Sequence, residues 1–172
     1  MLYLRTYFYS QDVPLSRPRQ KFFFFYFQGL SAILGQETPK GMRTFEFKTH
    51  AKEELVDITS VVRDEVESRG IASGICVVYA PHTTAGLIIN ENADPDVRKD
   101  ILMALRSIVP DSLPYLHTEG NSPGHVKSSI TGASVTVMIE NGRLILGVWQ
   151  GIFFCEFDGP RQRKVYIKIT PA

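Results

Sequence analysis

The chain of 172 residues is long enough for one domain with a sizeable core, and its 44% hydrophobic and 22% charged residues are typical of a globular protein. A net charge of +1 creates no strong field, which argues against nucleic acid or an anionic membrane as partners. The two cysteines, Cys76 and Cys155, lie in apolar runs without a paired spacing, which favours reduced, buried thiols over a disulfide or a thiolate metal site.

Residues 1–41 differ in composition from the rest of the chain: they carry five Lys or Arg, two Asp or Glu, and no regular period. Lys21 precedes a Phe-rich run that resembles a signal-peptide core, shorter than the about 20 residues of a bilayer span. A secretion signal, an interaction arm and a disordered extension foreign to the native protein are the alternatives. We favour the extension, because clean periodicity begins at Met42, and we expect a single domain over 42–172 in the cytoplasm.

The first half of this domain reads as strand, helix, strand, strand. Alternation of apolar and polar residues predicts a strand over 44–48. Helical spacing of the valines predicts a helix over 57–68, which Gly70 ends. Apolar, β-branched runs predict strands over 74–79 and 85–90, separated by a turn at Pro81.

The second half begins with a helix and ends in strands. Asp94 and Pro95 suit the cap and first position of a helix that runs to Pro110, and a polar loop over 111–127 follows. Asn141-Gly142 predicts a hairpin between strands 134–140 and 143–147. Two further strands are expected over 151–157 and 163–169. The order β-α-β-β-α-β-β-β-β predicts an α+β fold with a largely antiparallel sheet or sandwich and two main helices.

Three of the four histidines lie in polar turns or loops: His82, His117 and His125. Neutral imidazole is a common metal ligand, and three histidines would suit zinc. Their spacing is no known zinc signature, so surface or hydrogen-bonded loop histidines remain the alternative.

Carboxylates near strand ends are candidates for catalysis. Glu91 follows a predicted strand and could act as a general base or metal ligand. Glu156 and Asp158 lie two residues apart, where an extended strand would place both on one face for Mg²⁺ or acid–base chemistry. The alternative for Asp158 is an exposed ion pair with Arg161.

Other polar residues suit anion binding or stacking. Thr83, Lys127 and Arg161 could contact phosphate, and Asn121 lies in a loop whose glycines allow close backbone approach. The single tryptophan, Trp149, lies between glycines and could stack on a flat ring or simply belong to the core.

Five ordered motifs within residues 42–169 resemble the YjbQ family, which is often labelled secondary thiamine-phosphate synthase. The motifs are His82-Thr-Thr-Ala-Gly86, Asn90-Glu-Asn-Ala-Asp94, Gly120-Asn121 with His125-Val-Lys127, Gly142-Arg-Leu144 with Leu146-Gly-Val-Trp-Gln-Gly151, and Glu156-Phe-Asp-Gly-Pro-Arg161.

The resemblance implies a compact α+β homotrimer with a polar pocket between subunits. It implies a transferase that joins a pyrimidine diphosphate to a thiazole phosphate and releases pyrophosphate. The expected site residues are catalytic Glu91, Asn92, Glu156 and Asp158; substrate-binding Thr83, Asn121, Lys127, Trp149, Gln150 and Arg161; and metal-binding His82, His117 and His125, with zinc or magnesium. A zinc-dependent hydrolase with Glu91 or Glu156 as base, and a non-enzymatic trimeric binding module for a phosphorylated metabolite, are the alternatives.

Overall fold

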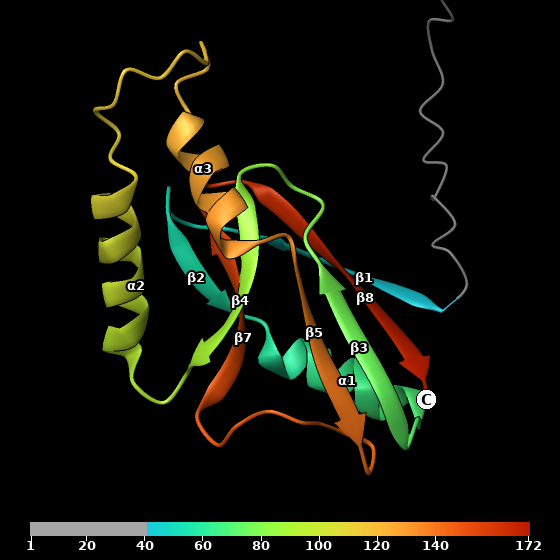
Figure 1. Ribbon diagram of the computed structural model, residues 1–172. Coiled ribbons are helices and arrows are strands. Elements are labelled where there is room, and N and C mark those ends of the chain that lie inside the picture. Colours follow the sequence, from blue (N-terminus) through green and yellow to red (C-terminus); the bar gives the residue numbers. More distant parts are fainter. Residues whose placement is uncertain (1–40) are drawn as a thin grey trace, which may run out of the picture. The chain divides into compact units, whose positions relative to one another are not determined.

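The computed structural model describes residues 41–172, which form eight strands and three helices (Figure 1). The extension expected over residues 1–41 lies, apart from Gly41, outside the described residues. The strands are β1 (Met42–Lys48), β2 (Glu54–Asp57), β3 (Ser73–Tyr79), β4 (Ala85–Glu91), β5 (Ser134–Glu140), β6 (Arg143–Leu144), β7 (Gln150–Glu156) and β8 (Gln162–Pro171). The helices are α1 (Thr59–Arg69), α2 (Pro95–Ile108) and α3 (Ser122–Thr131).

The strands form two sheets, ordered β1-β8-β3-β5-β6 and β2-β7-β4, in which all strand pairs are antiparallel. The predicted α+β fold with largely antiparallel sheets is confirmed. Two elements are additional to the predicted order: the short strand β2, and α3 within the segment expected to be loop. The strand expected over 143–147 is shorter in the structure, where β6 ends at Leu144.

Local signals determine several element boundaries. Gly70 adopts a left-handed conformation with φ of 62° at the end of α1, as a helix stop requires. The Asp94 side chain accepts a hydrogen bond from the backbone nitrogen of Asp96 and caps α2, whose first residue is proline. Asn141 and Gly142 have φ of 52° and 74°, so the hairpin turn between β5 and β6 forms where it was predicted.

The main core lies between the sheets and α1. Val62 and Val66 of α1 pack with inward residues of β3, β5, β7 and β8. A smaller cluster joins Leu105 of α2 to Phe153 and Cys155 of β7. The predicted apolar face of α2 is only partly covered, since Ile108 is 68% exposed.

Both cysteines are buried free thiols, as expected. Burial raises the pKa of Cys76 to about 11 and that of Cys155 to about 12, so both remain protonated near neutral pH.

Helix α3 positions the polar residues around the start of β4. Figure 1 shows it beside β4, while α2 runs alongside the three-stranded sheet. The Ser128 hydroxyl donates to the carbonyl of Ala85 at 2.7 Å. A side chain at Gly86 would meet Thr131 Oγ1 at 2.0 Å, so the end of α3 packs directly on the backbone of β4. Among residues 41–172, no helix is long and apolar enough to cross a membrane.

Candidate functional site

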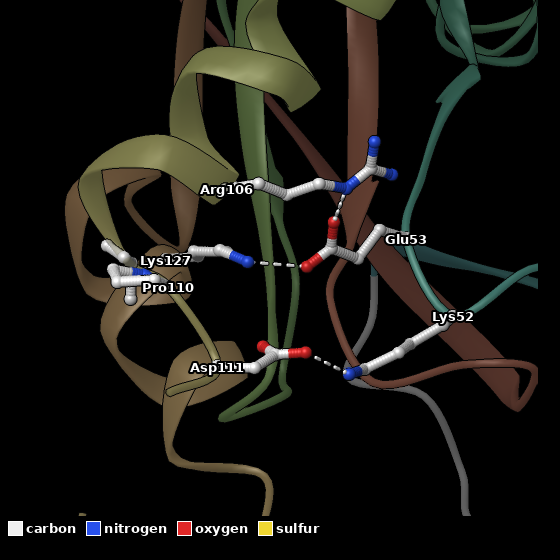
Figure 2. Close-up of a pocket in the computed structure, with 7 residues that line it drawn as sticks. Lys52, Glu53, Arg106, Pro110, Asp111 and Lys127 are labelled. Atoms are coloured by element: carbon white, nitrogen blue, oxygen red, sulfur yellow. Dashed lines mark hydrogen bonds and ion pairs between the residues drawn. The ribbon is translucent and has the colours of Figure 1, made fainter. Parts of the chain in front are cut away.

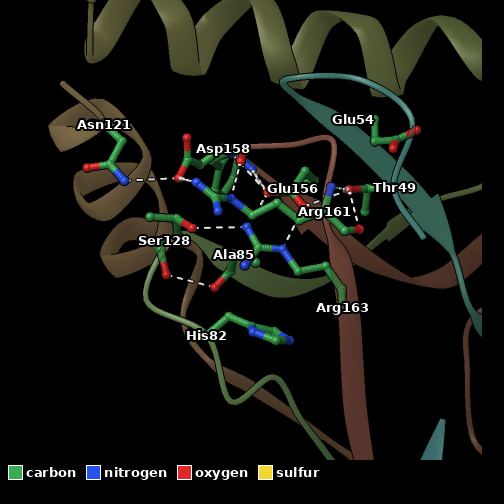
Figure 3. A network of polar contacts seen from close by, with 12 residues as sticks. Thr49, Glu54, His82, Ala85, Asn121, Ser128, Glu156, Asp158, Arg161 and Arg163 are labelled. Carbon is green, nitrogen blue, oxygen red and sulfur yellow. Dashed lines mark hydrogen bonds and ion pairs between the residues drawn. The ribbon is translucent and has the colours of Figure 1, made fainter. Parts of the chain in front are cut away.

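An open cavity of about 390 Å³ lies where the amino terminus of α3 meets the start of β4 and the segment that follows β7. We call it the α3 cavity. Figure 3 shows part of the polar network on this side of the molecule. The residues that line the cavity are Thr83, Thr84, His117, Glu119, Asn121, His125, Asp158, Arg161 and Arg163.

Backbone contacts hold these segments together. The backbone nitrogen of Phe157 donates to the carbonyl of Thr84 at 3.1 Å, which joins the chain after β7 to the chain before β4. A side chain at Gly124 would lie 3.1 Å from the Phe157 carbonyl and 3.4 Å from Thr84, so the first turn of α3 sits against both. The cavity therefore depends on a tight meeting of three segments that are distant in sequence.

His117 and His125 are brought together as the sequence predicted. Their ring centroids lie 5.3 Å apart, with the rings nearly perpendicular. Nε2 of His117 lies 3.6 Å from a carboxylate oxygen of Glu119. His125 is in the first turn of α3, so its position follows from the helix, which the sequence analysis expected to be loop.

Asp158 is an ionised residue that lines the cavity. It accepts a hydrogen bond from Asn121 Nδ2 at 2.9 Å and from Arg161 Nη2 at 2.7 Å. Burial alone would raise the pKa of Asp158, but these hydrogen bonds and the positive charge of Arg161 outweigh it and lower that pKa. The expected catalytic carboxylate is thus a stable anion, and its expected alternative, an ion pair with Arg161, is present.

Asn121 leaves one polar atom unsatisfied. Its Nδ2 donates to Asp158, whereas its Oδ1 is the buried side-chain polar atom in residues 41–172 without a hydrogen-bond partner. Asn121 occupies the N-cap position of α3 but makes no capping side-chain bond, and Pro123 removes one backbone donor from the first turn. The amino terminus of α3 therefore borders the cavity without a side-chain cap.

His82 lies apart from the other two histidines. Its Nε2 is 3.1 Å from the backbone nitrogen and 3.0 Å from the carbonyl oxygen of Lys164. The backbone of β8 therefore engages this ring nitrogen. It borders a separate hollow with Glu46 and Gln162. Within the described part of one chain, no three His, Cys, Asp or Glu side chains group as metal ligands. The expected three-histidine set is therefore not assembled within one copy.

Glu156 is a structural residue in this fold, contrary to its expected catalytic role. Its side chain is fully buried. It accepts hydrogen bonds from Nε and Nη2 of Arg163, from the Thr49 hydroxyl, and from the backbone nitrogens of Phe157 and Asp158. Five donors occupy its two oxygens, so its acceptor positions are taken up by contacts within the protein. Figure 3 shows Arg163 and Thr49 on either side of Glu156.

Four expected site residues lie at the opposite end of the three-stranded sheet. Glu91 ends β4 and pairs with Gln150 at the start of β7, about 20 Å along the strand from Ala85. Asn92 Nδ2 donates to Asp57 at 2.6 Å, and its backbone nitrogen donates to the carbonyl of Trp149. Within one copy, these residues cannot reach a ligand in the α3 cavity.

Lys127 was expected to bind substrate beside His125, but it points away from the α3 cavity because α3 is a helix. Residues two apart on a helix face different sides. Its side chain is 1% exposed, and its ammonium bonds Glu53 at 2.5 Å. This ion pair borders a second cavity, which Arg106 also lines (Figure 2). We call it the Lys127 cavity.

Some residues of these cavities were missed in the sequence. Glu119 lies in the same polar loop as His117, so its position was a usable signal. The sequence contained no signal for Glu53 and Arg106, because they lie 53 residues apart and their contact depends on how α2 packs against the chain before β2.

The fold and the α3 cavity define a small α+β protein that gathers imidazoles, hydroxyls and a guanidinium at one end of a three-stranded sheet. A family model described as "UPF0047 protein YjbQ-like" matches residues 43–172, and the chain belongs to this family.

Relatives support this assignment. The chain is 53% identical to the UPF0047 protein YugU of Bacillus subtilis over 129 residues, which cover 74% of this chain and 98% of that relative. It is 50% identical to UPF0047 protein MJ1081 of Methanocaldococcus jannaschii over 125 residues, covering 73% and 91%. A crystal structure of a yjbq/upf0047 family protein from Clostridium acetobutylicum matches with a TM-score of 0.73 and 51% identity, covering 74% of this chain and 99% of that one.

The comparisons correct the expected activity. The relatives carry the UPF0047 designation without an activity, and the similar structure from Sulfolobus solfataricus is described as a protein of unknown function. It matches with a TM-score of 0.74 and 32% identity, covering 76% of this chain and 96% of that one. The expected thiamine-phosphate synthase-type transferase is therefore wrong as a property inherited from the family.

Proposed function

We propose that the α3 cavity binds a small phosphorylated metabolite. The observation that carries the proposal is the convergence of the uncapped amino terminus of α3, the Arg161 guanidinium and the Thr83 and Thr84 side chains on one open cavity. Helix amino termini, guanidinium groups and hydroxyls are the groups with which proteins hold phosphate oxygens.

Arg161 retains donors for such a ligand. Its Nε donates to the backbone carbonyl of Asp158 at 2.6 Å and its Nη2 donates to the carboxylate of the same residue. A guanidinium has five N–H groups, so these two bonds fix its orientation without exhausting it. Asp158 thereby holds Arg161 in place and acts as a positioning residue for the proposed ligand.

The expected divalent ion remains a prediction. His117 and His125 would supply two imidazole nitrogens, and oxygen atoms of the phosphorylated ligand would supply further positions. Two imidazoles alone leave a tetrahedral zinc shell incomplete. Ligand binding measured after dialysis against a chelator, with and without added Zn²⁺ or Mg²⁺, tests this prediction separately.

The homotrimer also remains a prediction, and two exposed apolar sites support it. Val148 is 98% exposed and Trp149 65% exposed in the segment before β7, and Leu116 is 96% exposed beside the α3 cavity. Association between copies would cover such side chains. It could also bring Trp149 and Gln150 of one copy to the α3 cavity of another.

Calorimetric titration with phenyl phosphate tests the proposed function. We expect saturable binding to the wild type. Arg161→Met should bind with an affinity lower by about tenfold or more, because a charge-assisted hydrogen bond is lost. Lys48→Met removes a solvent-exposed cation elsewhere and should bind as the wild type does. Benzyl alcohol, which lacks the phosphate, should not bind. Equal affinities of wild type and Arg161→Met would show that the phosphate binds elsewhere.

A further inference from the structure

Within residues 41–172, the α3 cavity has no apolar residue in its lining. Cavities that bind small molecules are usually lined mostly by hydrophobic and aromatic side chains, with a few polar groups that orient the ligand. Here each of the nine lining residues of the described chain carries a hydroxyl, imidazole, carboxyl, amide or guanidinium group. The Lys127 cavity, by contrast, includes Val109 and Pro110 in its lining. An apolar ligand body would therefore find few partners in the α3 cavity.

Two neighbouring side chains of this lining are accessible to a ligand. The Glu119 side chain is 71% exposed, and that of His117 is 44% exposed. Glu119 Oε2 lies 3.6 Å from His117 Nε2, which is longer than a hydrogen bond. In residues 41–172, no group donates a hydrogen bond to the Glu119 carboxylate. Both side chains therefore have hydrogen-bonding capacity left for a ligand.

Glu119 restricts which part of a ligand can lie beside it. A carboxylate only accepts hydrogen bonds, and a phosphate group brought next to it would be repelled by the like charge. The proposed phosphate contacts in the same cavity are Arg161 and the amino terminus of α3. The ligand atoms beside Glu119 must therefore belong to another group, and that group must donate hydrogen bonds.

A hydroxyl suits this position better than an ammonium group. An ammonium group only donates hydrogen bonds, whereas a hydroxyl both donates and accepts them. A hydroxyl can donate to Glu119 and also pair with either nitrogen of the His117 ring, which donates or accepts according to its tautomer. The volume of about 390 Å³ lies near the lower end of the range for small-molecule sites, which favours a compact ligand.

We propose that the phosphorylated metabolite of the α3 cavity is a compact polyol or sugar phosphate, with its phosphate at Arg161 and its hydroxyls at Glu119 and His117. This inference rests on the proposed function, because phosphate binding is what places the ligand in the cavity. The competing explanation is that Glu119 and His117 are solvated surface groups and that the phosphate alone is recognised. In that case, hydroxyls on the ligand would add nothing to its affinity.

Calorimetric titration of the full chain with glycerol 1-phosphate and with propyl phosphate separates the two explanations. The two esters share the phosphate and the carbon chain and differ only in the hydroxyls. We expect glycerol 1-phosphate to bind about tenfold more tightly or better, because a hydroxyl donates to a charged acceptor. The third ligand, 3-aminopropyl phosphate, carries an ammonium group in place of the terminal hydroxyl and should bind less tightly than glycerol 1-phosphate.

Glu119→Met tests the contact at the residue itself. The ratio of the two ester affinities is the informative quantity, because repulsion between Glu119 and the phosphate acts on both esters alike. We expect this ratio to fall about tenfold in Glu119→Met, since the charged acceptor is lost. Glu67→Met removes an exposed carboxylate of α1 that does not line the cavity, and it should keep the wild-type ratio.

The outcomes distinguish this inference from the proposed function. If neither ester bound to the wild type, the proposed function would fail and this inference would fail with it. If both esters bound with equal affinity, or if Glu119→Met kept the wild-type ratio, phosphate binding would stand and the ligand would not be a polyol phosphate. Tighter binding of 3-aminopropyl phosphate than of glycerol 1-phosphate would also overturn the inference.

Discussion

Glu156 and Arg163 form a two-point ion pair inside the protein: Arg163 Nε lies 2.7 Å from Glu156 Oε2, and its Nη2 lies 2.5 Å from Oε1. Both side chains are buried, and Thr49 and Thr84 bond to the pair from two other segments. The pair therefore fixes β7 and β8 relative to the chain before β2 and β4.

Removing one member should cost far more than removing a surface charge. Arg163→Met leaves an unpaired buried carboxylate, and we expect the free energy of unfolding to fall by about 3–5 kcal/mol. Urea denaturation measures this free energy. Asp96→Asn, which breaks an exposed ion pair with Lys99, is the control and should be unaffected. The double variant Glu156→Gln with Arg163→Met should lose less than the sum of the single losses. A loss as small as that of Asp96→Asn would contradict a structural role for the pair.

His82 should make stability depend on pH. Burial, followed by the nearby positive charge of Arg163, lowers the pKa of His82 below its usual value. Between that lowered pKa and the unfolded value of about 6.5, the unfolded chain binds more protons than the folded chain. The contribution of His82 is therefore complete above about pH 6.5 and is lost as the pH falls through this interval.

Urea midpoints measured across this interval check the expectation. His82→Gln should reduce the decline in stability on acidification, whereas His50→Gln, which alters an exposed histidine, should leave the decline unchanged. An identical decline in wild type and His82→Gln would show that other groups cause it.

The sequence predicted most elements because their signals are local. Asp94, Gly70 and Asn141-Gly142 act on their neighbours in the chain, and each marks the boundary or turn that it was expected to mark. Helix α3 was missed because Ser122-Pro123-Gly124 is typical of a loop. Contacts with Thr84, Ala85 and Phe157, all distant in sequence, surround this helix.

The same distinction applies to the α3 cavity. His117 and His125 were predicted to meet, and they do, because they lie eight residues apart at the two ends of one short segment. The contacts of His82 and Glu156 depend on β8, which supplies Lys164 as the partner of His82 and Arg163 as the partner of Glu156. No spacing in the sequence reveals such contacts between distant strands.

Gly86 should control how α3 sits on β4. A Cβ atom there would lie 2.0 Å from Thr131 Oγ1 and 2.8 Å from the Gly132 carbonyl, so Gly86→Ala must displace the end of α3. We expect a loss of about 1–3 kcal/mol in the free energy of unfolding, as for other overpacked sites. Because α3 carries Asn121 and His125, phenyl phosphate binding should weaken as well.

Adding Thr131→Ala removes the closest clash and should restore part of the lost stability. Ser129→Ala changes an exposed residue of the same helix and should behave as the wild type in denaturation and titration. Full stability of Gly86→Ala would show that β4 and α3 can separate freely.

Val148 should be a determinant of the predicted homotrimer. Its side chain is 98% exposed next to Trp149, an arrangement that leaves apolar surface in water unless another copy covers it. We expect the wild type to sediment as three chains of 19.4 kDa, and Val148→Asp to shift the population to monomers, because a buried unpaired charge opposes association. Met103→Asp, which alters a 60% exposed residue of α2, is the matched control and should stay trimeric. A monomeric wild type would refute the trimer, and a trimeric Val148→Asp would place its interface elsewhere.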